Sequence, residues 1–394
     1  MKNILLVNTY YHPNGRGGAE RSTRILAESL AELGFRVSVI TTSNICSTVT
    51  INGVDVYYVN MGNLYWLQEA NKHSIVKKML WHLVDSYGLN DAREFEAIVQ
   101  KIKPDIVLTN NLVQFSCKVF KVLRKLNIPI LHIIRDHYLM DMSTVMYKDM
   151  SFWRRMVTGR MLSVRKKKYS QYVNGVIGIS EYIIQKHLAN GYFKNAVIKA
   201  VIPNAIASCN KFEVKSKSGK PIFGYVGALN PRKGVDLIVE VFSRKSISNS
   251  LFFFGSGSES YVQKLFNISS QHPNIQCRGY KSPDRIFREI DILIVPSLIN
   301  EAFGRVIIEA YSYGIPVIGS NRGGIPELID VNKTGFIFDP DIKDSLINTI
   351  EENSLDKFVN PELKNYSFEK SKLFLSEVVV NKYLDVFTLL KKVL

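Results

Sequence analysis

Short apolar runs alternate with helical stretches along the whole chain, and this alternation is the feature that most limits which folds the chain can adopt. In the first half, strands are expected at Ile4–Val7, Val37–Ile40, Ile106–Leu108, Ile130–Ile134 and Val176–Ile179. In the second half, they are expected at Phe223–Val226, Leu251–Phe254, Ile292–Val295, Pro316–Ile318 and Gly335–Phe338. Helices are expected between them, at about 93–102, 116–126, 235–243, 259–269, 283–289, 304–313 and 342–352. Strands spaced by helices indicate an α/β fold with parallel sheets.

The length of the chain favours two domains. A single hydrophobic core stops growing near ~250–300 residues, and this chain has 394. A polar stretch at 208–220 fits a surface segment just past the boundary. We therefore expect a first domain at 1–200 and a second at 201–374. The apolar segment Val378–Leu394 reads as a closing helix.

The net charge of +16 is unevenly distributed. Residues 1–199 hold 27 Lys or Arg and 14 Asp or Glu, whereas residues 200–394 hold 24 and 21. An excess confined to one half suggests an anionic partner for that half, which is a membrane surface, a nucleic acid or a charged acceptor.

Cysteine usage and hydropathy bear on the cellular compartment. The four cysteines are scattered, which argues against a zinc site or a disulfide framework and favours a reducing compartment. The apolar run Ile4–Val7 is too short for a secretory signal, and no stretch reaches the ~18 apolar residues of a transmembrane helix. A cytoplasmic protein is expected.

The segment Glu301-Ala302-Phe303-Gly304-Arg305-Val306-Ile307-Ile308-Glu309 carries the clearest chemistry. Backbone N–H groups around Phe303, Gly304 and Arg305 would be exposed where a helix is expected to begin, which suits an anion. Glu309 follows Glu301 by eight residues, a little over two turns along the same helix. Amides for a pyrophosphate and carboxylates for hydroxyl groups suit a nucleotide sugar.

Further loops stand in a fixed order with this segment. They are Gly227-Ala228-Leu229-Asn230-Pro231-Arg232-Lys233-Gly234, Phe254-Gly255-Ser256-Gly257, Arg278-Gly279-Tyr280, Pro296-Ser297 and Gly323-Gly324-Ile325-Pro326-Glu327. With the paired glutamates, this series resembles that of the retaining GT-B glycosyltransferases of family 4. The resemblance implies two Rossmann-like, doubly wound parallel-sheet domains facing across a cleft. It also implies that the C-terminal helix, about 375–394, packs back on the first domain.

The resemblance implies a role for each residue of the second half. Lys233 would face the donor diphosphate and Glu301 would contact the donor sugar, both as catalytic residues. Relatives usually carry arginine where this chain has Ala228, and Arg232 or Arg305 is the expected substitute. The expected donor-binding residues are Gly227, Arg232, Gly255, Tyr280, Phe303, Gly304, Arg305 and Glu309. No cofactor is expected, and a UDP-sugar is expected as donor ahead of a GDP-sugar.

The first half resembles the acceptor-binding domain of the family less closely. Gly17 and Gly18 lie in a loop that would approach acceptor or phosphate, because glycine lets the backbone come close to a ligand; a plain loop is the alternative. Arg135-Asp136-His137 ends an expected strand, where a ligand crevice forms in such sheets. Asp136 is expected to position the acceptor hydroxyl as a catalytic residue, and Arg135 to meet phosphate or an acidic sugar. His137 belongs to this loop or packs in its wall.

Residues 151–171 contain seven Lys or Arg and no acid, interleaved with apolar side chains. Such a basic amphipathic stretch is typical of a helix lying on an anionic membrane. The alternative is a solvated connecting helix. The cluster of Lys72, Lys77 and Lys78 with the apolar residues of 75–81 would extend the same face. Nucleic acid ranks lower, because no nucleic-acid-binding motif is present. The expected membrane patch is Arg154, Arg155, Arg165, Lys166, Lys167 and Lys168.

The resemblance thus implies a retaining glycosyltransferase that uses no metal. The lack of an Asp-X-Asp motif where metal-dependent GT-A enzymes need one agrees with this expectation. A lipid-linked glycan acceptor would explain the basic first half and points to bacterial surface polysaccharide or lipopolysaccharide assembly, with the protein peripheral on the inner face of the cytoplasmic membrane. A soluble or protein acceptor is one alternative. A catalytically silent nucleotide-sugar binder, which Ala228 makes possible, is the other.

Overall fold

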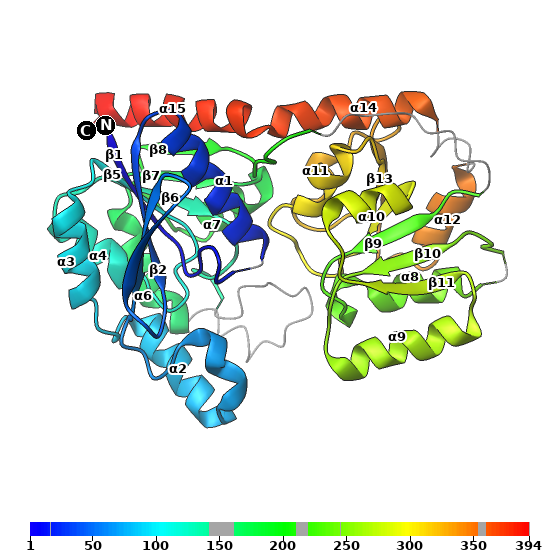
Figure 1. The fold of residues 1–394 in the computed structure, drawn as a ribbon, viewed down its shortest axis with the longest axis horizontal. Helices are drawn as coiled ribbons and strands as arrows, with labels where there is room; N and C mark the ends of the chain where they lie inside the picture. Colours follow the sequence, from blue (N-terminus) through cyan, green and yellow to red (C-terminus); the bar gives the residue numbers. More distant parts are fainter. Residues whose placement is uncertain (16, 142–160, 210–219, 245, 354–359, 394) are drawn as a thin grey trace. The chain divides into compact units, whose positions relative to one another are not determined.

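A computed structural model describes residues 1–15, 17–141, 161–209, 220–244, 246–353 and 360–393 (Figure 1). The chain divides into two compact units, Met1–Ala205 together with Ser376–Leu394, and Ile206–Leu375. The boundary lies five residues beyond the one expected from the sequence, and the C-terminal segment belongs to the first unit. Arg154 and Arg155 of the expected membrane patch lie outside the described residues.

The described part of the first unit contains an eight-stranded sheet in the order β3-β4-β2-β1-β5-β6-β7-β8. All neighbouring strands are parallel except β3 and β4. The strands are β1 (Asn3–Val7), β2 (Arg36–Thr42), β3 (Ser47–Ile51), β4 (Val54–Val59), β5 (Ile106–Thr109), β6 (Ile130–Ile134), β7 (Gly175–Gly178) and β8 (Ile198–Val201). The helices are α1 (Gly18–Glu32), η1 (Leu67–Lys72), α2 (Ile75–Tyr87), α3 (Arg93–Ile102), α4 (Lys118–Lys125), α6 (Leu162–Tyr169), η3 (Ser170–Tyr172), α7 (Glu181–Ala189) and α15 (Ser376–Val393).

The described part of the second unit contains a six-stranded parallel sheet in the order β11-β10-β9-β12-β13-β14. Its strands are β9 (Phe223–Val226), β10 (Leu251–Phe254), β11 (Ile275–Gly279), β12 (Ile292–Val295), β13 (Val317–Ser320) and β14 (Gly335–Phe338). Its helices are η4 (Pro231–Lys233), α8 (Val235–Phe242), α9 (Glu259–Gln271), α10 (Pro283–Glu289), α11 (Arg305–Tyr311), η5 (Pro326–Leu328), α12 (Ser345–Glu352), α14 (Pro361–Ser371) and η6 (Lys372–Phe374).

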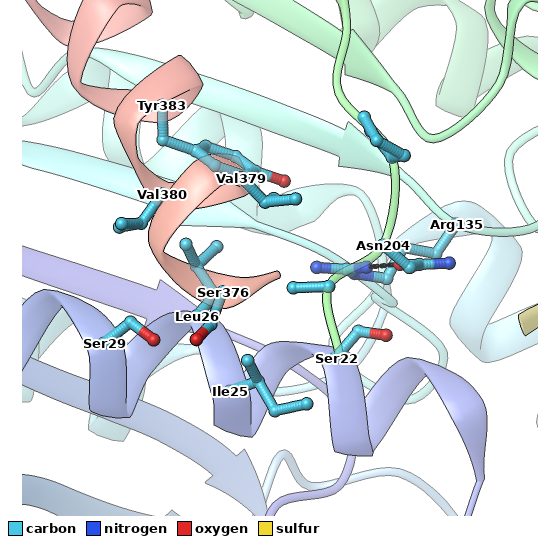
Figure 2. A pocket seen from close by; sticks show the side chains of 12 residues that line it. Ser22, Ile25, Leu26, Ser29, Arg135, Asn204, Ser376, Val379, Val380 and Tyr383 are labelled. Carbon is cyan, nitrogen blue, oxygen red and sulfur yellow. Dashed lines mark hydrogen bonds between the residues drawn. The ribbon is translucent and has the colours of Figure 1, made fainter. Parts of the chain in front are cut away.

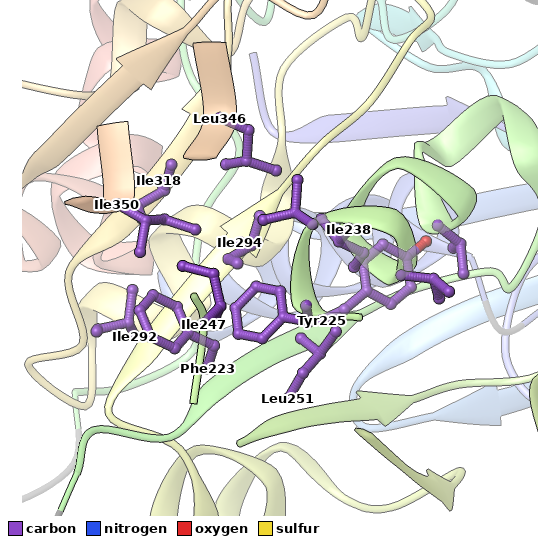
Figure 3. Packing of buried hydrophobic residues seen from close by; sticks show 14 of the residues in the cluster. Phe223, Tyr225, Ile238, Ile247, Leu251, Ile292, Ile294, Ile318, Leu346 and Ile350 are labelled. Atoms are coloured by element: carbon purple, nitrogen blue, oxygen red, sulfur yellow. The ribbon is translucent and has the colours of Figure 1, made fainter. Parts of the chain in front are cut away.

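The central strands are short, continuous apolar runs because both faces of each sheet are covered. In the second unit, Phe223, Ile292 and Ile294 project from the strands into a buried cluster that also takes Ile238 from α8 and Leu346 from α12 (Figure 3). These side chains are almost entirely removed from water. Apart from the antiparallel pair β3–β4, both sheets are therefore parallel sheets of an α/β fold, as the alternation of strands and helices predicts.

The hairpin of β3 and β4 was not predicted. Every residue of β3 except the last is exposed, so the strand carries no buried alternation. Its turn does carry a signal: Asn52 and Gly53 have φ values of 50° and 78°. Two successive left-handed residues form the type I′ turn that joins a tight hairpin, and Asn-Gly is its preferred sequence.

The C-terminal helix α15 packs on α1 within the first unit (Figure 2). Val379, Val380 and Tyr383 project from α15 toward Ile25 and Leu26 of α1. The buried residues of α15 recur at three- and four-residue intervals, which places them on one face of the helix. Within the described residues, no helix is both long and apolar enough to span a bilayer.

A buried ionic network joins α2, α6 and the loop after β6. The Tyr138 hydroxyl donates to Asp85 Oδ2 at 2.6 Å, and Lys166 Nζ donates to the Tyr138 carbonyl oxygen at 2.9 Å. The Lys166 ammonium also lies 3.6 Å from the centre of the Tyr138 ring. Burial raises the pKa of Asp85 to about 6 and lowers the pKa of Lys166, while each charge opposes the shift of the other.

This network corrects the expected membrane patch. Lys166 is only 2% exposed, so it cannot contact a membrane. The sequence showed four consecutive cations but not which of them faces the core. Arg165, Lys167 and Lys168 are exposed on α6, and Arg165 Nη1 donates to the Tyr87 carbonyl oxygen at 2.7 Å.

Replacing Lys166 by methionine should lower the free energy of unfolding by about 3–5 kcal/mol, because Asp85 would be left as a buried acid without its cation. Lys168→Met, on the exposed side of the same helix, should change it by less than about 0.5 kcal/mol. Urea denaturation of both variants measures the difference. Equally small effects at the two positions would contradict the buried network.

Candidate active site

In the second unit, the order of the strands reverses between β9 and β12, which lie side by side at the centre of the sheet. Chains leaving adjacent strands at such a point turn to opposite faces of the sheet, so a crevice opens at the carboxyl ends of the strands. The two bordering loops are residues 227–234 after β9 and 296–304 after β12. These loops carry the two predicted catalytic residues of this unit.

Lys233 and Glu301 form an ion pair across this point. Both side chains are partly buried, with exposed fractions of 31% and 20%. The same Glu301 oxygen accepts a hydrogen bond of 2.8 Å from the Ser297 hydroxyl. The side-chain oxygen of Asn230 caps the short helix η4 by accepting a hydrogen bond of 3.2 Å from the Lys233 backbone amide, and this bond fixes the backbone position of Lys233. The structure thus brings together an ammonium and a carboxylate that lie 68 residues apart.

Glycines allow the close backbone approach on which this pair depends. A Cβ atom at Gly234, where φ is 74°, would overlap the Pro296 carbonyl group. A Cβ atom at Gly323, where φ is 58°, would overlap the backbone of Glu301. The Gly324 amide donates to the Glu301 carbonyl oxygen at 2.8 Å. The Gly323-Gly324 pair therefore supports Glu301 from behind, which is a structural role.

Glu309 pairs with Arg305, one turn away on α11, at 2.9 Å. Both side chains are largely buried, so each limits the desolvation cost of the other. Gly304 has a φ of 108° and ends the loop, and α11 begins at Arg305. Phe303 is 4% exposed and its ring packs edge-on against Phe374 at 6.3 Å, so this side chain belongs to the core and does not face a donor.

The remaining predicted donor-binding residues lie at the ends of β9, β10 and β11. Gly227 and Gly255 have φ values of 155° and 148°, and a Cβ atom at Gly255 would overlap the Gly227 carbonyl oxygen. These glycines let two loops pack without a gap. Arg232 and Tyr280 are exposed, Tyr280 by 79%. Ala228 is also exposed, and its carbonyl oxygen accepts from the Tyr225 hydroxyl at 2.7 Å.

In the first unit, the corresponding reversal lies between β1 and β5. The side chain of Glu20 packs against the glycine loop that follows β1, next to Gly15 and Gly17. A Cβ atom at Gly17 would overlap the Glu20 carboxylate, which takes hydrogen bonds from the amides of Gly17 and of Glu20 itself. Burial raises the pKa of Glu20, and these amides and the charge of Arg135 oppose the rise. Gly18 begins α1. The sequence pattern alone does not indicate this role of Glu20.

Arg135 lines a small pocket together with residues of α1 and α15 (Figure 2), and its contact with phosphate or an acidic sugar stays a prediction. Its side chain is buried, Nε donates to Asn110 Oδ1 at 3.0 Å, and Nη1 donates to Asn204 Oδ1 (Figure 2). Burial lowers the pKa of Arg135, and Tyr383, Glu20 and Asp136 oppose this shift. Arg135 therefore ties the end of β6 to the loop after β5 and to the segment that leaves the unit.

The next two residues of that loop differ from one another. His137 is buried and stacks on His187, with ring centres 6.2 Å apart, so it packs in the wall. Burial lowers the pKa of His187 to about 3. Asp136 keeps some contact with solvent, yet burial raises its pKa to about 6. Its carboxylate accepts from the Tyr138 amide at 2.8 Å. The contact of Asp136 with an acceptor hydroxyl stays a prediction.

Comparison with known proteins is consistent with this geometry. The model described as Glycosyltransferase Family 4 matches residues 16–207, and that described as Glycosyl transferases group 1 matches residues 209–370. An uncharacterised 42.6 kDa protein from the cps region of Klebsiella pneumoniae is 34% identical over 329 residues, which are 83% of this chain and 87% of that protein. The chain belongs to glycosyltransferase family 4.

This glycosyltransferase is also similar to other proteins and to solved structures. A lipopolysaccharide 1,2-N-acetylglucosaminetransferase of Salmonella typhimurium is 31% identical over 148 residues, 34% of this chain and 39% of that protein. The structure of sucrose-phosphate synthase from Thermosynechococcus elongatus matches with a TM-score of 0.75 at 18% identity, covering 100% of both chains. The structure of Anabaena HepE in complex with UDP matches with a TM-score of 0.71 at 15% identity, covering 98% of this chain and 99% of the other. These structures share the GT-B fold with this chain.

One contact in this glycosyltransferase was not anticipated. Ser297 was noted only as part of a loop, but its buried hydroxyl fixes one oxygen of Glu301. A serine four residues before a loop carboxylate gives no signal by itself, because loop geometry decides whether the two side chains meet. Within the described residues, no group of three or more His, Cys, Asp or Glu side chains is arranged to hold a metal ion.

Replacing Gly323 by alanine should destabilise the second unit by more than backbone strain alone, because the new Cβ atom would displace Glu301. Gly279→Ala is the matched control: its φ of 68° is also left-handed, but no atom lies within 4 Å of the added carbon. The control should cost about 1–2 kcal/mol of unfolding free energy, and Gly323→Ala at least about 1 kcal/mol more. Denaturant unfolding compares them, and equal losses would refute the supporting role of Gly323.

Proposed function

We propose that this glycosyltransferase moves one sugar from a nucleotide-diphosphate sugar to a hydroxyl group, with retention of anomeric configuration and without a metal ion. The observation that carries the proposal is the contact between Lys233 and Glu301 at the strand reversal of the second unit. A cation for a leaving diphosphate and a carboxylate for sugar hydroxyls are the two groups that such a donor needs.

Lys233 and Glu301 contact different parts of the proposed donor. Lys233 stabilises the charge that grows on the departing diphosphate, and Glu301 accepts hydrogen bonds from the sugar hydroxyls while Ser297 holds the carboxylate oxygen that also contacts Lys233. Glu309 takes the ribose hydroxyls, and Arg305 or Arg232 supplies the second cation that Ala228 does not. A UDP-sugar is proposed ahead of a GDP-sugar, and the structures of HepE, determined with UDP and with UDP-glucose, support that preference.

In the proposed step, the bond between the anomeric carbon and the diphosphate oxygen breaks, and the acceptor oxygen bonds to the same face of that carbon. The acceptor proton passes to the departing phosphate oxygen, so no protein nucleophile is required. Lys233 stabilises this oxygen more strongly as its charge grows, which lowers the barrier rather than merely tightening binding. Asp136 orients the acceptor hydroxyl, and its carboxylate form predominates above about pH 6.

The proposed acceptor is a lipid-linked glycan of bacterial surface polysaccharide or lipopolysaccharide assembly, used by a protein that is peripheral on the inner face of the cytoplasmic membrane. Two relatives support this choice: one is a protein of a cps region and the other is named as a lipopolysaccharide glycosyltransferase. Residues 1–199 contain 27 basic and 14 acidic residues, and this excess of positive charge also favours an anionic membrane as partner.

Calorimetric titration with UDP and with GDP tests the donor site. UDP should bind with micromolar affinity, and Glu309→Ala should weaken it by about tenfold or more, since a hydrogen bond to a charged group contributes roughly 1.5–3 kcal/mol. Glu259→Ala, at an exposed position at the start of α9, is the control and should bind UDP as the wild type does.

The outcomes separate the alternatives. Binding of neither nucleotide, or equal binding by wild type and Glu309→Ala, would refute the proposed site. Binding of UDP with no release of UDP from any UDP-sugar offered with cell-envelope lipid would favour the silent binder. Transfer to a soluble glycan but not to lipid extract would favour the soluble acceptor.

A further inference from the structure

Helix α2 presents apolar side chains to solvent along one face. Their exposed fractions run from 40% at Leu83 to 76% at Ile75, although a helix of a globular protein normally turns such residues inward. Contiguous apolar surface on a folded protein usually marks an interaction site. The exposed apolar residues of this face are Ile75, Val76, Met79, Leu80 and Leu83.

The face is regular. At about 100° per residue, these five positions span an arc of about 140°. Trp81 lies on the opposite side of the helix, where its ring is fully buried and its Nε1 donates to the Tyr65 carbonyl oxygen at 2.8 Å. Asp85, also on the inner side, accepts from Tyr138. The helix is thus fixed to the first unit by one side while its apolar side stays outward.

Both ends of α2 are well defined. The Ser74 hydroxyl caps the first turn by accepting from the Lys77 amide, and Gly88, with a φ of 64°, ends the helix in the left-handed conformation. The exposed face therefore belongs to a complete, capped helix. A fixed helix can present this surface without the entropic cost of ordering it on contact.

Basic residues surround the apolar arc. Lys77 and Lys78 flank it, one on each side, whereas Lys72, just before the helix, is paired with Glu69 at 3.1 Å. The neighbouring helix α6 adds Arg165, which is linked to the end of α2 through the Tyr87 carbonyl oxygen, and the exposed Lys168. The sole acid within α2 and α6 is Asp85, which is buried.

We propose that the outward face of α2 inserts into the acyl region of a membrane that contains anionic phospholipid, with Lys77 and Lys78 meeting the headgroups. An apolar arc between lysines matches the layers of such a surface: hydrocarbon for Leu80 and its neighbours, phosphate for the ammonium groups. The inference deepens the proposed function and rests on its membrane-bound acceptor. A second copy of this chain fits less well, because a symmetric contact would bring the lysines of two faces together.

Flotation of the full chain through a sucrose gradient tests this proposal. The probes are vesicles of phosphatidylethanolamine with phosphatidylglycerol, and vesicles of phosphatidylcholine alone. The wild type should float with the anionic vesicles. The double substitution Val76→Ser/Leu80→Ser should reduce the partition constant for binding to these vesicles by about tenfold or more, because it removes apolar surface from the inserted face. Lys77→Gln/Lys78→Gln should lower binding to the anionic vesicles several-fold and leave the phosphatidylcholine result unchanged.

Leu33→Ser/Ile45→Ser is the matched control, because these residues are 51% and 70% exposed in the same unit but lie away from α2 in the sequence. It should float as the wild type does. The proposal is overturned if the wild type does not float, or if Val76→Ser/Leu80→Ser floats unchanged. Loss of self-association in that variant, measured by gel filtration with flotation intact, would identify a second copy as the occupant and also overturn it.

The same samples separate this inference from the proposed function. UDP titration of Val76→Ser/Leu80→Ser should match the wild type, because both substitutions lie in the first unit. If UDP binds but the wild type does not float, the membrane face fails and the donor site stands. If the wild type floats but UDP does not bind, the donor site fails and the membrane face stands.

Discussion

The contact between Lys233 and Glu301 depends on how closely two backbones approach at the reversal of the second sheet. An ammonium on the loop after β9 can reach a carboxylate on the loop after β12 only because glycines border both loops. Gly234 gives the first loop room against Pro296, and Gly323 gives the second room against the chain that follows β13. The geometry of the proposed donor site thus depends first on how closely the backbone segments pack.

The two units treat their strand reversals differently. In the second unit, charged side chains remain partly open to solvent at the reversal. In the first, the Glu20 carboxylate occupies the space under the glycine loop, and the buried Arg135 holds the neighbouring loops together through Asn110 and Asn204. Asp136 alone of the Arg135-Asp136-His137 series keeps solvent contact.

The sequence predicted the elements whose physics is local. Apolar runs such as Phe223–Val226 became central strands, and the Lys233 and Glu301 loops fell at the strand ends where the motif order put them. It failed where burial depends on packing from elsewhere in the chain. Four consecutive cations did not reveal that Lys166 alone turns inward to Tyr138, and a strand-end arginine did not reveal that Asn204 would close over Arg135. The exposed strand β3 has no alternation of buried and exposed residues that could predict it, although the Asn52-Gly53 sequence does indicate its turn.

The most direct test of the account is UDP binding to Lys233→Ala, Glu301→Ala and the double variant, measured by calorimetry. UDP lacks the sugar that Glu301 would hold, and Glu301 competes with the diphosphate for the Lys233 ammonium. We therefore expect Lys233→Ala to weaken UDP binding by about tenfold or more, and Glu301→Ala to leave it unchanged or to strengthen it. The double variant should resemble Lys233→Ala alone. Wild-type affinity in Lys233→Ala, or an equal loss in Glu301→Ala, would contradict the proposed division of roles within the pair.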